Sequence, residues 1–156
     1  MFQIRKSLLV CLAASVVAAT TLLPIASAQD ARAAQQVKLR QSAYTVLGAQ
    51  MGLMGAMASG RAPYDANAFR AAAERAAAMG NYVPELFPAG SITPNSKAKP
   101  ELWQQQAEFQ RLMKDMQGKV TALATTARGG DLEAIKPAFG ATGASCKACH
   151  DKYKAD

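Results

Sequence analysis

The chain has 156 residues, of which 50% are hydrophobic and 19% charged, and this balance fits a single globular domain. Aromatic residues make up only 6%, and β-branched residues are sparse after the first 25 positions, which excludes an all-β fold. Lys and Arg outnumber Asp and Glu by 18 to 11, but they are spread along the chain, which argues against a nucleic-acid partner.

The first 28 residues have the pattern of an export signal. Arg5 and Lys6 precede an apolar stretch over residues 8–23, and Ala26-Ser27-Ala28 forms an A-x-A cleavage site before Gln29. We therefore expect residues 1–28 to be a cleaved signal peptide and residues 29–156 to be a periplasmic domain without membrane contact.

A membrane anchor is the alternative interpretation of this segment. The stretch contains Ser and Thr and is shorter than the roughly 20 apolar residues that a spanning helix needs. Cys11 lies in this segment, so Cys146 and Cys149 are the cysteines of the expected mature chain.

Two helices are predicted after the signal. The first runs from about Arg32 to Ser59 and ends at Gly60. The second follows Asp65, a good N-cap, and is an Ala-rich run that we expect to stop at Gly80.

A long surface loop is expected over residues 81–100, because this segment contains Pro84, Pro88, Gly90, Pro94 and Pro100. Three of its apolar side chains are available to pack against the core: Tyr82, Phe87 and Ile92.

A third helix is predicted from about Glu101 to the Gly129-Gly130 pair. Its apolar residues recur every three or four positions and form one face, which consists of Leu102, Phe109, Met113, Met116, Val120 and Leu123.

The last helix follows Asp131, which can cap it, and Pro137 either kinks it or restarts it. One face of this helix carries Leu132, Ile135, Phe139, Thr142, Cys146, Cys149 and Tyr153. Four helices joined mostly by short loops favour an all-α, antiparallel four-helix bundle.

The first helix is apolar on two sides. One side carries Val37, Tyr44, Leu47, Met51 and Met54. The other carries Leu39, Val46, Leu53 and Met57, and Ala43 links the two. This wide arc predicts either a homodimer built through the first helix or contact with two neighbouring helices of the same bundle.

The motif with the most specific chemistry is Cys146-Lys147-Ala148-Cys149-His150, the C-x-x-C-H pattern of c-type haem attachment. Residues three and four apart share a helix face, so both thiols and the imidazole project toward the same space. The thiols can add to the two haem vinyl groups while His150, the only histidine of the chain, reaches the iron.

Two other chemistries use similar residues. A disulfide or a thioredoxin-like redox site would use Cys146 and Cys149, but such a site follows a strand in a mixed fold, and no strand is predicted here. A closed zinc site would need a fourth ligand that the neighbouring sequence does not obviously provide.

A helical chain with this motif at its C-terminal end resembles cytochrome c′. The resemblance covers nearly all of residues 29–156. It is carried by Arg40-Gln41-Ser42-Ala43, by Ala62-Pro63-Tyr64-Asp65-Ala66 and by the run from Gly143 to Asp151, which contains the C-x-x-C-H motif.

The resemblance implies one covalently bound haem c, with His150 as the proximal iron ligand. It implies that Arg40 and Gln41 approach the haem propionates and that Tyr44 lies over the open, distal face. Lys154 stands where the family pattern has Arg, four residues after the histidine, so the charge is kept but the planar set of donors is lost.

The residues themselves give partial support to these roles. Arg40 shares a face with Tyr44, and a charge that faces a bundle core needs a counter-charge, which haem propionates would supply. The alternatives are an arginine that extends from the helix to solvent and a tyrosine that is simply a core aromatic.

Two functions follow from the resemblance. The first is a five-coordinate, high-spin cytochrome that binds nitric oxide and carbon monoxide. The second is a low-spin electron carrier in which Met51 or Met54 supplies the sixth ligand. Leu47 stands about where low-spin relatives place that methionine, which favours gas binding. A catalytic role is not expected, because the chain has no second histidine to act as a distal acid or base.

Overall fold

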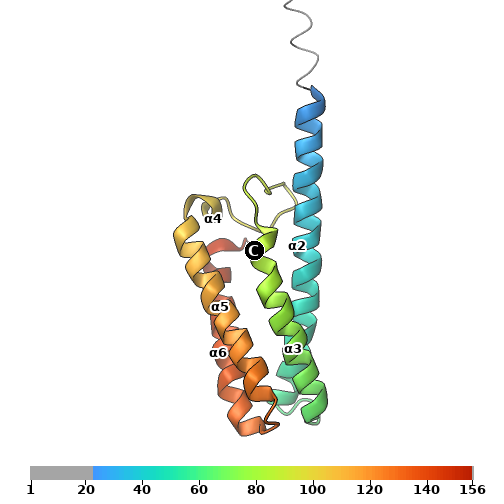
Figure 1. Ribbon diagram of the computed structural model, residues 1–156, viewed down its shortest axis with the longest axis vertical. Helices are drawn as coiled ribbons and strands as arrows, with labels where there is room; N and C mark the ends of the chain where they lie inside the picture. The colour runs from blue at the N-terminus through green and yellow to red at the C-terminus, as the bar shows by residue number, and fades with distance from the viewer. Residues whose placement is uncertain (1–22, 156) are drawn as a thin grey trace, which may run out of the picture.

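The computed structural model describes residues 23–155, so most of the predicted signal peptide and Cys11 lie outside the described part of the chain. Within these residues, four long helices form an antiparallel bundle (Figure 1). They are α2 (Leu23–Ala58), α3 (Ala66–Tyr82), α5 (Gln106–Ala127) and α6 (Leu132–Tyr153), with a short 3-10 helix η1 (Val83–Leu86) and a short helix α4 (Glu101–Gln104) between α3 and α5. The predicted all-α four-helix bundle is confirmed.

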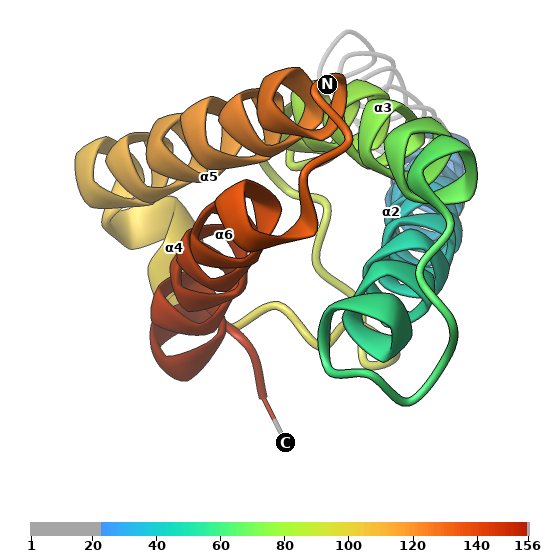
Figure 2. The ribbon, with the colours of Figure 1, turned by 90° about the horizontal axis from the view of Figure 1, so that it is seen from below.

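The helices pair unequally around the bundle. α3 packs against both α2 and α5, and α6 packs along α5, whereas α2 and α6 make few contacts with each other. Figure 2 looks along the bundle and shows α2 and α6 on opposite sides of its interior. Any site between α2 and α6 is therefore bounded by the first and last helices of residues 23–155.

Two helix starts agree with their predicted caps. Asp65 accepts hydrogen bonds from the backbone N–H groups of Asn67 and Ala68 at 2.9 and 3.0 Å. Asp131 accepts one from the N–H of Glu133 at 2.9 Å. Each carboxylate satisfies donors that the first helical turn leaves without intrahelical partners.

The first helix begins earlier than predicted, at Leu23 instead of about Arg32, and so passes through the expected cleavage site before Gln29. The residues after Pro24 are mostly Ala and Gln, which favour helix. In residues 23–155 we find no helix long and apolar enough to span a membrane.

The prediction that Gly80 ends the second helix is wrong, because α3 continues through it to Tyr82. Gly80 is buried, and a Cβ at this position would lie 2.7 Å from Cγ1 of Val120 in α5. The glycine is therefore required by the close approach of α3 and α5 and does not mark a helix end.

We expect Gly80→Ala to destabilise the protein by about 1 to 3 kcal/mol, because the added methyl group overpacks the contact with Val120. Gly118→Ala is the matched control: Gly118 is exposed within α5 and a Cβ there meets nothing within 4 Å, so up to about 1 kcal/mol of stabilisation is expected. Urea unfolding of both variants measures the difference. An unfolding midpoint for Gly80→Ala equal to that of the parent would contradict the close-approach explanation.

The segment after α3 differs from the predicted loop. Phe87 is half-buried against the core as expected, but Tyr82 and Ile92 are 40% and 42% exposed. Tyr82 lies outside the buried face of α3. The backbone and side chain of Ser91 point inward, so the next residue, Ile92, points outward. The expectation that these two side chains pack against the core is therefore wrong.

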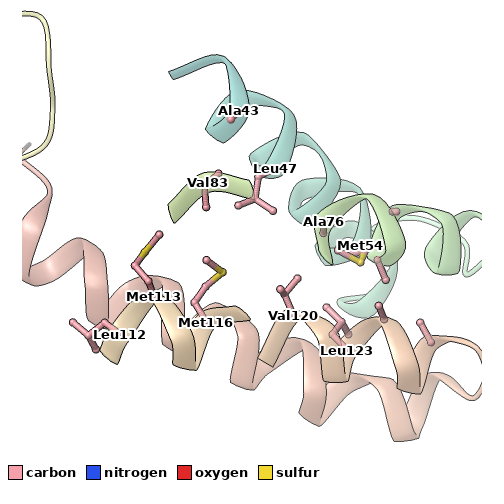
Figure 3. Close-up of a cluster of buried hydrophobic side chains, with 14 of the residues drawn as sticks. Ala43, Leu47, Met54, Ala76, Val83, Leu112, Met113, Met116, Val120 and Leu123 are labelled. Atoms are coloured by element: carbon pink, nitrogen blue, oxygen red, sulfur yellow. The ribbon is translucent and has the colours of Figure 1, made fainter. Parts of the chain in front are cut away.

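The core follows the predicted faces closely, as Figure 3 shows for part of it. All six apolar residues predicted for the third helix are buried, although this helix is divided at Gln105 into α4 and α5. α6 runs unbroken from Leu132 to Tyr153 with Pro137 inside it, although the proline removes the hydrogen bond to the Glu133 carbonyl. The proline therefore does not restart the helix.

The second apolar side of α2 is confirmed in part. Leu39, Val46 and Leu53 are 38%, 46% and 45% exposed and repeat every seven residues, so they lie in one row on the outer surface. Met57 does not belong to this row: it is 3% exposed and packs in the core, because it follows Met54 by three positions on the inner face.

Candidate functional site

A cavity of about 620 Å³ lies between α2 and α6. Its size falls within the roughly 300 to 1,000 Å³ typical of sites for cofactors and small molecules. α2 contributes Val37, Arg40, Gln41, Tyr44, Thr45, Leu47, Gly48 and Met51, and α6 with its C-cap contributes Gly143, Cys146, Cys149, His150, Tyr153 and Lys154. The remaining walls are formed by Phe87, Ser96, Lys97, Ala98, Leu102 and Phe109.

The α6 wall brings the whole C-x-x-C-H motif together. Cys146, Cys149 and His150 all line the cavity, as their spacing predicts. Both cysteines are half-buried free thiols, and desolvation raises the pKa of each. The disulfide interpretation is thus not supported, and the two thiols stand on one helix face toward one ligand space.

His150 projects from the next position of the same wall and remains exposed on one side. Desolvation of its ring, helped by the positive charge of Lys154 and opposed by Asp151, lowers the pKa of His150 below its ordinary value. At neutral pH the imidazole is therefore neutral, which is the form that can coordinate a metal.

The opposite wall, on α2, carries Tyr44, Leu47 and Met51. Burial is the main cause that raises the pKa of Tyr44 far above its ordinary value, so the phenol is protonated at any working pH. Met54 does not line the cavity, because it is completely buried in the core. Of the two methionines considered as iron ligands, the structure leaves Met51.

Arg40 is only 5% exposed and lines the cavity, but it has partners other than a carboxylate. Its Nη1 donates to the Leu86 carbonyl at 3.0 Å and to Ser91 Oγ at 3.2 Å. Its Nη2 donates to the Ser91 carbonyl at 2.9 Å and to Ser96 Oγ at 3.1 Å. The counter-charge expected for Arg40 is thus replaced here by four neutral oxygens, and its approach to a propionate stays a prediction.

Gln41 and Lys154 lie at the edge of the cavity. Gln41 donates from Nε2 to the Asn95 carbonyl at 2.9 Å, so it holds the same loop as Arg40. Lys154 is exposed, and its N–H donates to the His150 carbonyl at the end of α6. Among residues 23–155, the charged side chains that line the cavity are Arg40, Lys97 and Lys154, and no carboxylate joins them, so the site favours an anionic group.

These features fit a c-type haem. The cavity has mostly apolar walls for the macrocycle, two thiols and one neutral imidazole on one wall, and positive charge for two propionates. A bare metal site fits less well, since no three His, Cys, Asp or Glu side chains between residues 23 and 155 gather to hold an ion.

The sequence interpretation missed part of the site. Residues 96–98 line the cavity because they run beside the end of α6, where the Lys99 N–H donates to the Tyr153 carbonyl and the Ala155 N–H to the Lys97 carbonyl, both at 2.8 Å. No local pattern marks this pairing. Tyr153 also lines the site, and its position four residues after Cys149 was the available signal.

Comparison with known proteins agrees with this geometry. The family model described as Cytochrome C' matches residues 35–154. Cytochrome c' of Alcaligenes xylosoxydans xylosoxydans is 37% identical over 126 residues, which cover 81% of this chain and 98% of that protein.

Two solved structures show the same architecture. Cytochrome c prime from Shewanella frigidimarina is 40% identical, with a TM-score of 0.77 over 80% of this chain and 97% of that chain. A nitric oxide complex of a mutant of cytochrome c prime from Alcaligenes xylosoxidans is 35% identical, with a TM-score of 0.75 over 80% and 97% of the respective chains.

Proposed function

The chain belongs to the cytochrome c′ family and is a c-type cytochrome with one covalently bound haem c, and on this basis we propose that it binds nitric oxide and carbon monoxide. A solved relative that is 35% identical carries nitric oxide in its structure. The role is ligand binding, with no catalytic residue assigned.

The residues of the C-x-x-C-H motif and of the polar edge each have one part in this proposal. Cys146 and Cys149 hold the haem through two thioethers, and His150 is the proximal iron ligand. Arg40, Gln41 and Lys154 lie at the polar edge of the site, where the propionates are expected. The haem supplies the iron that binds the gas, and the protein chain supplies the orientation and the apolar surroundings.

The observation that carries the proposal is the character of the opposite wall. Tyr44, Leu47, Gly48 and Met51 line the cavity on the side away from His150, which we call the distal side. The Tyr44 phenol keeps its proton, so it fills space on the distal side without being a good iron ligand. An iron without a sixth ligand from the protein is five-coordinate and open to a diatomic gas.

The spin state of the ferric protein tests this proposal. We expect absorption and electron paramagnetic resonance spectra of a high-spin iron, since neither Tyr44 nor Leu47 is a strong ligand. Addition of carbon monoxide to the ferrous protein is then expected to give a new spectrum. A high-spin parent that fails to respond to either gas would contradict gas binding.

An electron carrier with a methionine ligand is the second candidate, because Met51 is half-buried and lines the cavity. Under this alternative the parent is low-spin, and Met51→Leu converts it to high-spin by removing the thioether. A high-spin parent with an unchanged Met51→Leu spectrum excludes this candidate.

We also propose that the protein is an exported homodimer. The signal pattern of residues 1–28 supports the periplasm as its location. The exposed row Leu39, Val46 and Leu53 supports a symmetric contact between two α2 helices. Redox partner proteins are not identified by these features.

The dimer proposal predicts the effect of a charge on this row. Val46→Arg is expected to yield monomers, because the contact would bury two unpaired guanidinium groups near the symmetry axis. Gln110→Arg, at an exposed position of α5, adds the same charge and is expected to remain dimeric. Sedimentation of the parent and both variants is the measurement, and a parent that is monomeric at high concentration would contradict the proposal.

A further inference from the structure

We propose that Arg40 is a positioning residue that holds Phe87 behind Tyr44, so that the loop over residues 86–96 controls how readily a gas enters the distal side. This inference rests on the proposed gas binding and extends it to Phe87 and the loop over residues 86–96, which have no assigned role in it. Three contacts carry it, from Arg40 to the loop, from Arg40 to Phe87, and from Phe87 to Tyr44.

The first contact ties α2 to the loop. The two terminal nitrogens of Arg40 donate to four oxygens spread over Leu86, Ser91 and Ser96, at 2.9 to 3.2 Å. All these bonds come from the planar guanidinium of a residue that is only 5% exposed, so they are shielded from water. A lysine has one ammonium and cannot span the same set of acceptors.

The second contact fixes an aromatic ring. The guanidinium carbon of Arg40 lies 4.5 Å from the ring centroid of Phe87 and 5.9 Å from that of Trp103. Trp103 itself donates from Nε1 to the Pro88 carbonyl at 3.1 Å. The carbonyls of the two residues that flank Phe87 thus each accept a hydrogen bond. One face of the Phe87 ring lies against the buried guanidinium of Arg40.

The third contact reaches the distal side. Phe87 meets Tyr44 edge to face with ring centroids 6.4 Å apart, and it meets Phe109 in the same way at 5.1 Å. Phe87 and Tyr44 both line the cavity. A gas that displaces the Tyr44 ring must therefore move it relative to a phenylalanine that Arg40 and Phe109 hold in place.

This arrangement makes the mobility of Tyr44 depend on a residue one helical turn away. When the hydrogen bonds between Arg40 and the loop are lost, the Phe87 ring can move. The Tyr44 ring can then rotate away from the distal side at a lower free-energy cost. The distal side then opens more often, and the association rate constant for carbon monoxide rises, because entry is limited by the fraction of open molecules.

A double-mutant cycle on the haem-loaded ferrous protein tests the inference. Carbon monoxide association is measured after flash photolysis for Arg40→Lys and Phe87→Leu, each with Tyr44 present and with Tyr44→Ala. With Tyr44 present we expect about a tenfold faster association, which corresponds to the loss of one buried cation–π contact. In the Tyr44→Ala background we expect no further acceleration.

The two variants probe the same contact from both partners. Arg40→Lys keeps the charge but loses the four-oxygen arrangement, and Phe87→Leu leaves the hydrogen bonds of Arg40 in place while removing the aromatic ring. Lys38→Gln is the control for charge, since Lys38 is exposed two positions away on α2 and is expected to leave the rate constant unchanged. Phe87→Leu also keeps the test decisive if Arg40→Lys does not fold.

Hydrogen exchange of the same holoproteins is the second measurement. Apart from Pro88 and Pro94, which have no N–H, the amides of residues 86–96 are expected to exchange faster in Arg40→Lys, while those of α5 keep their parent rates. Unchanged exchange in residues 86–96 would overturn the role of Arg40 in holding the loop. Equal acceleration of carbon monoxide binding with and without Tyr44 would overturn the coupling through Tyr44.

Failure of the proposed function has a different signature. If neither the parent nor Tyr44→Ala binds carbon monoxide, gas binding itself is wrong, and the inference about gas entry falls with it. If Tyr44→Ala binds the gas faster but Arg40→Lys and Phe87→Leu do not, gas binding stands and only the positioning role is wrong.

Discussion

Replacement of Tyr44 by alanine is expected to raise the carbon monoxide affinity of the ferrous protein. Tyr44 lines the distal side of the cavity and contacts Phe87, so a bound gas must push its ring out of a packed position. Truncation removes that cost in advance. The largest gain is bounded by the cost of truncating a buried aromatic side chain, about 3 to 5 kcal/mol.

Tyr44→Phe separates the ring from its hydroxyl group. It keeps the packing against Phe87 and removes only the phenol oxygen, so its carbon monoxide affinity is expected to stay near that of the parent. Titration of the three ferrous proteins at equal concentration gives the comparison. Equal affinities of the parent and Tyr44→Ala would remove Tyr44 from the distal side.

Loss of both cysteines is expected to abolish covalent haem attachment. The parent should keep its colour with the polypeptide after acid–acetone extraction, whereas Cys146→Ala combined with Cys149→Ala should release any bound haem into the solvent phase. Both thiols line the same cavity, and each can form one thioether. Lys147→Ala, at an exposed position between them, is the control and should behave as the parent.

His150→Ala distinguishes attachment from coordination. The two thioethers remain, so the haem should stay with the chain, but the absorption spectrum should change because the neutral imidazole is lost from the iron. Single replacement of either cysteine keeps one thioether and is the fallback if the double variant does not accumulate. Release of haem from the parent by acid–acetone extraction would exclude a c-type attachment, and an unchanged His150→Ala spectrum would exclude His150 as ligand.

Features that depend on neighbours within one helix are predictable from the sequence. Asp65 and Asp131 cap helices because a short carboxylate satisfies backbone donors within its own turn. The apolar face of α5 from Phe109 to Leu123 is buried because its period matches the helix. The C-x-x-C-H motif needs only one helix to bring its three side chains together, so spacing alone predicts that they share a site.

Positions that depend on a neighbouring element are predicted less well. Gly80 has the pattern of a helix end because glycine is common there, but its role is set by Val120, which lies 40 positions further along the chain. Met57 and Leu53 are both apolar residues of α2, but Met57 is buried and Leu53 is exposed. The difference depends on where α3 and the core pack against α2.

The chemistry of the site can therefore be predicted from a contiguous motif and from helical periodicity. Both are features of the sequence that span only one or two helical turns. The shape of the site is decided by the tertiary structure. The partners of Arg40 lie 46 to 56 positions away, and residues 97–99 meet the end of α6 only after the bundle has formed. Such contacts depend on how helices and loops pack in space, and no local spacing encodes them.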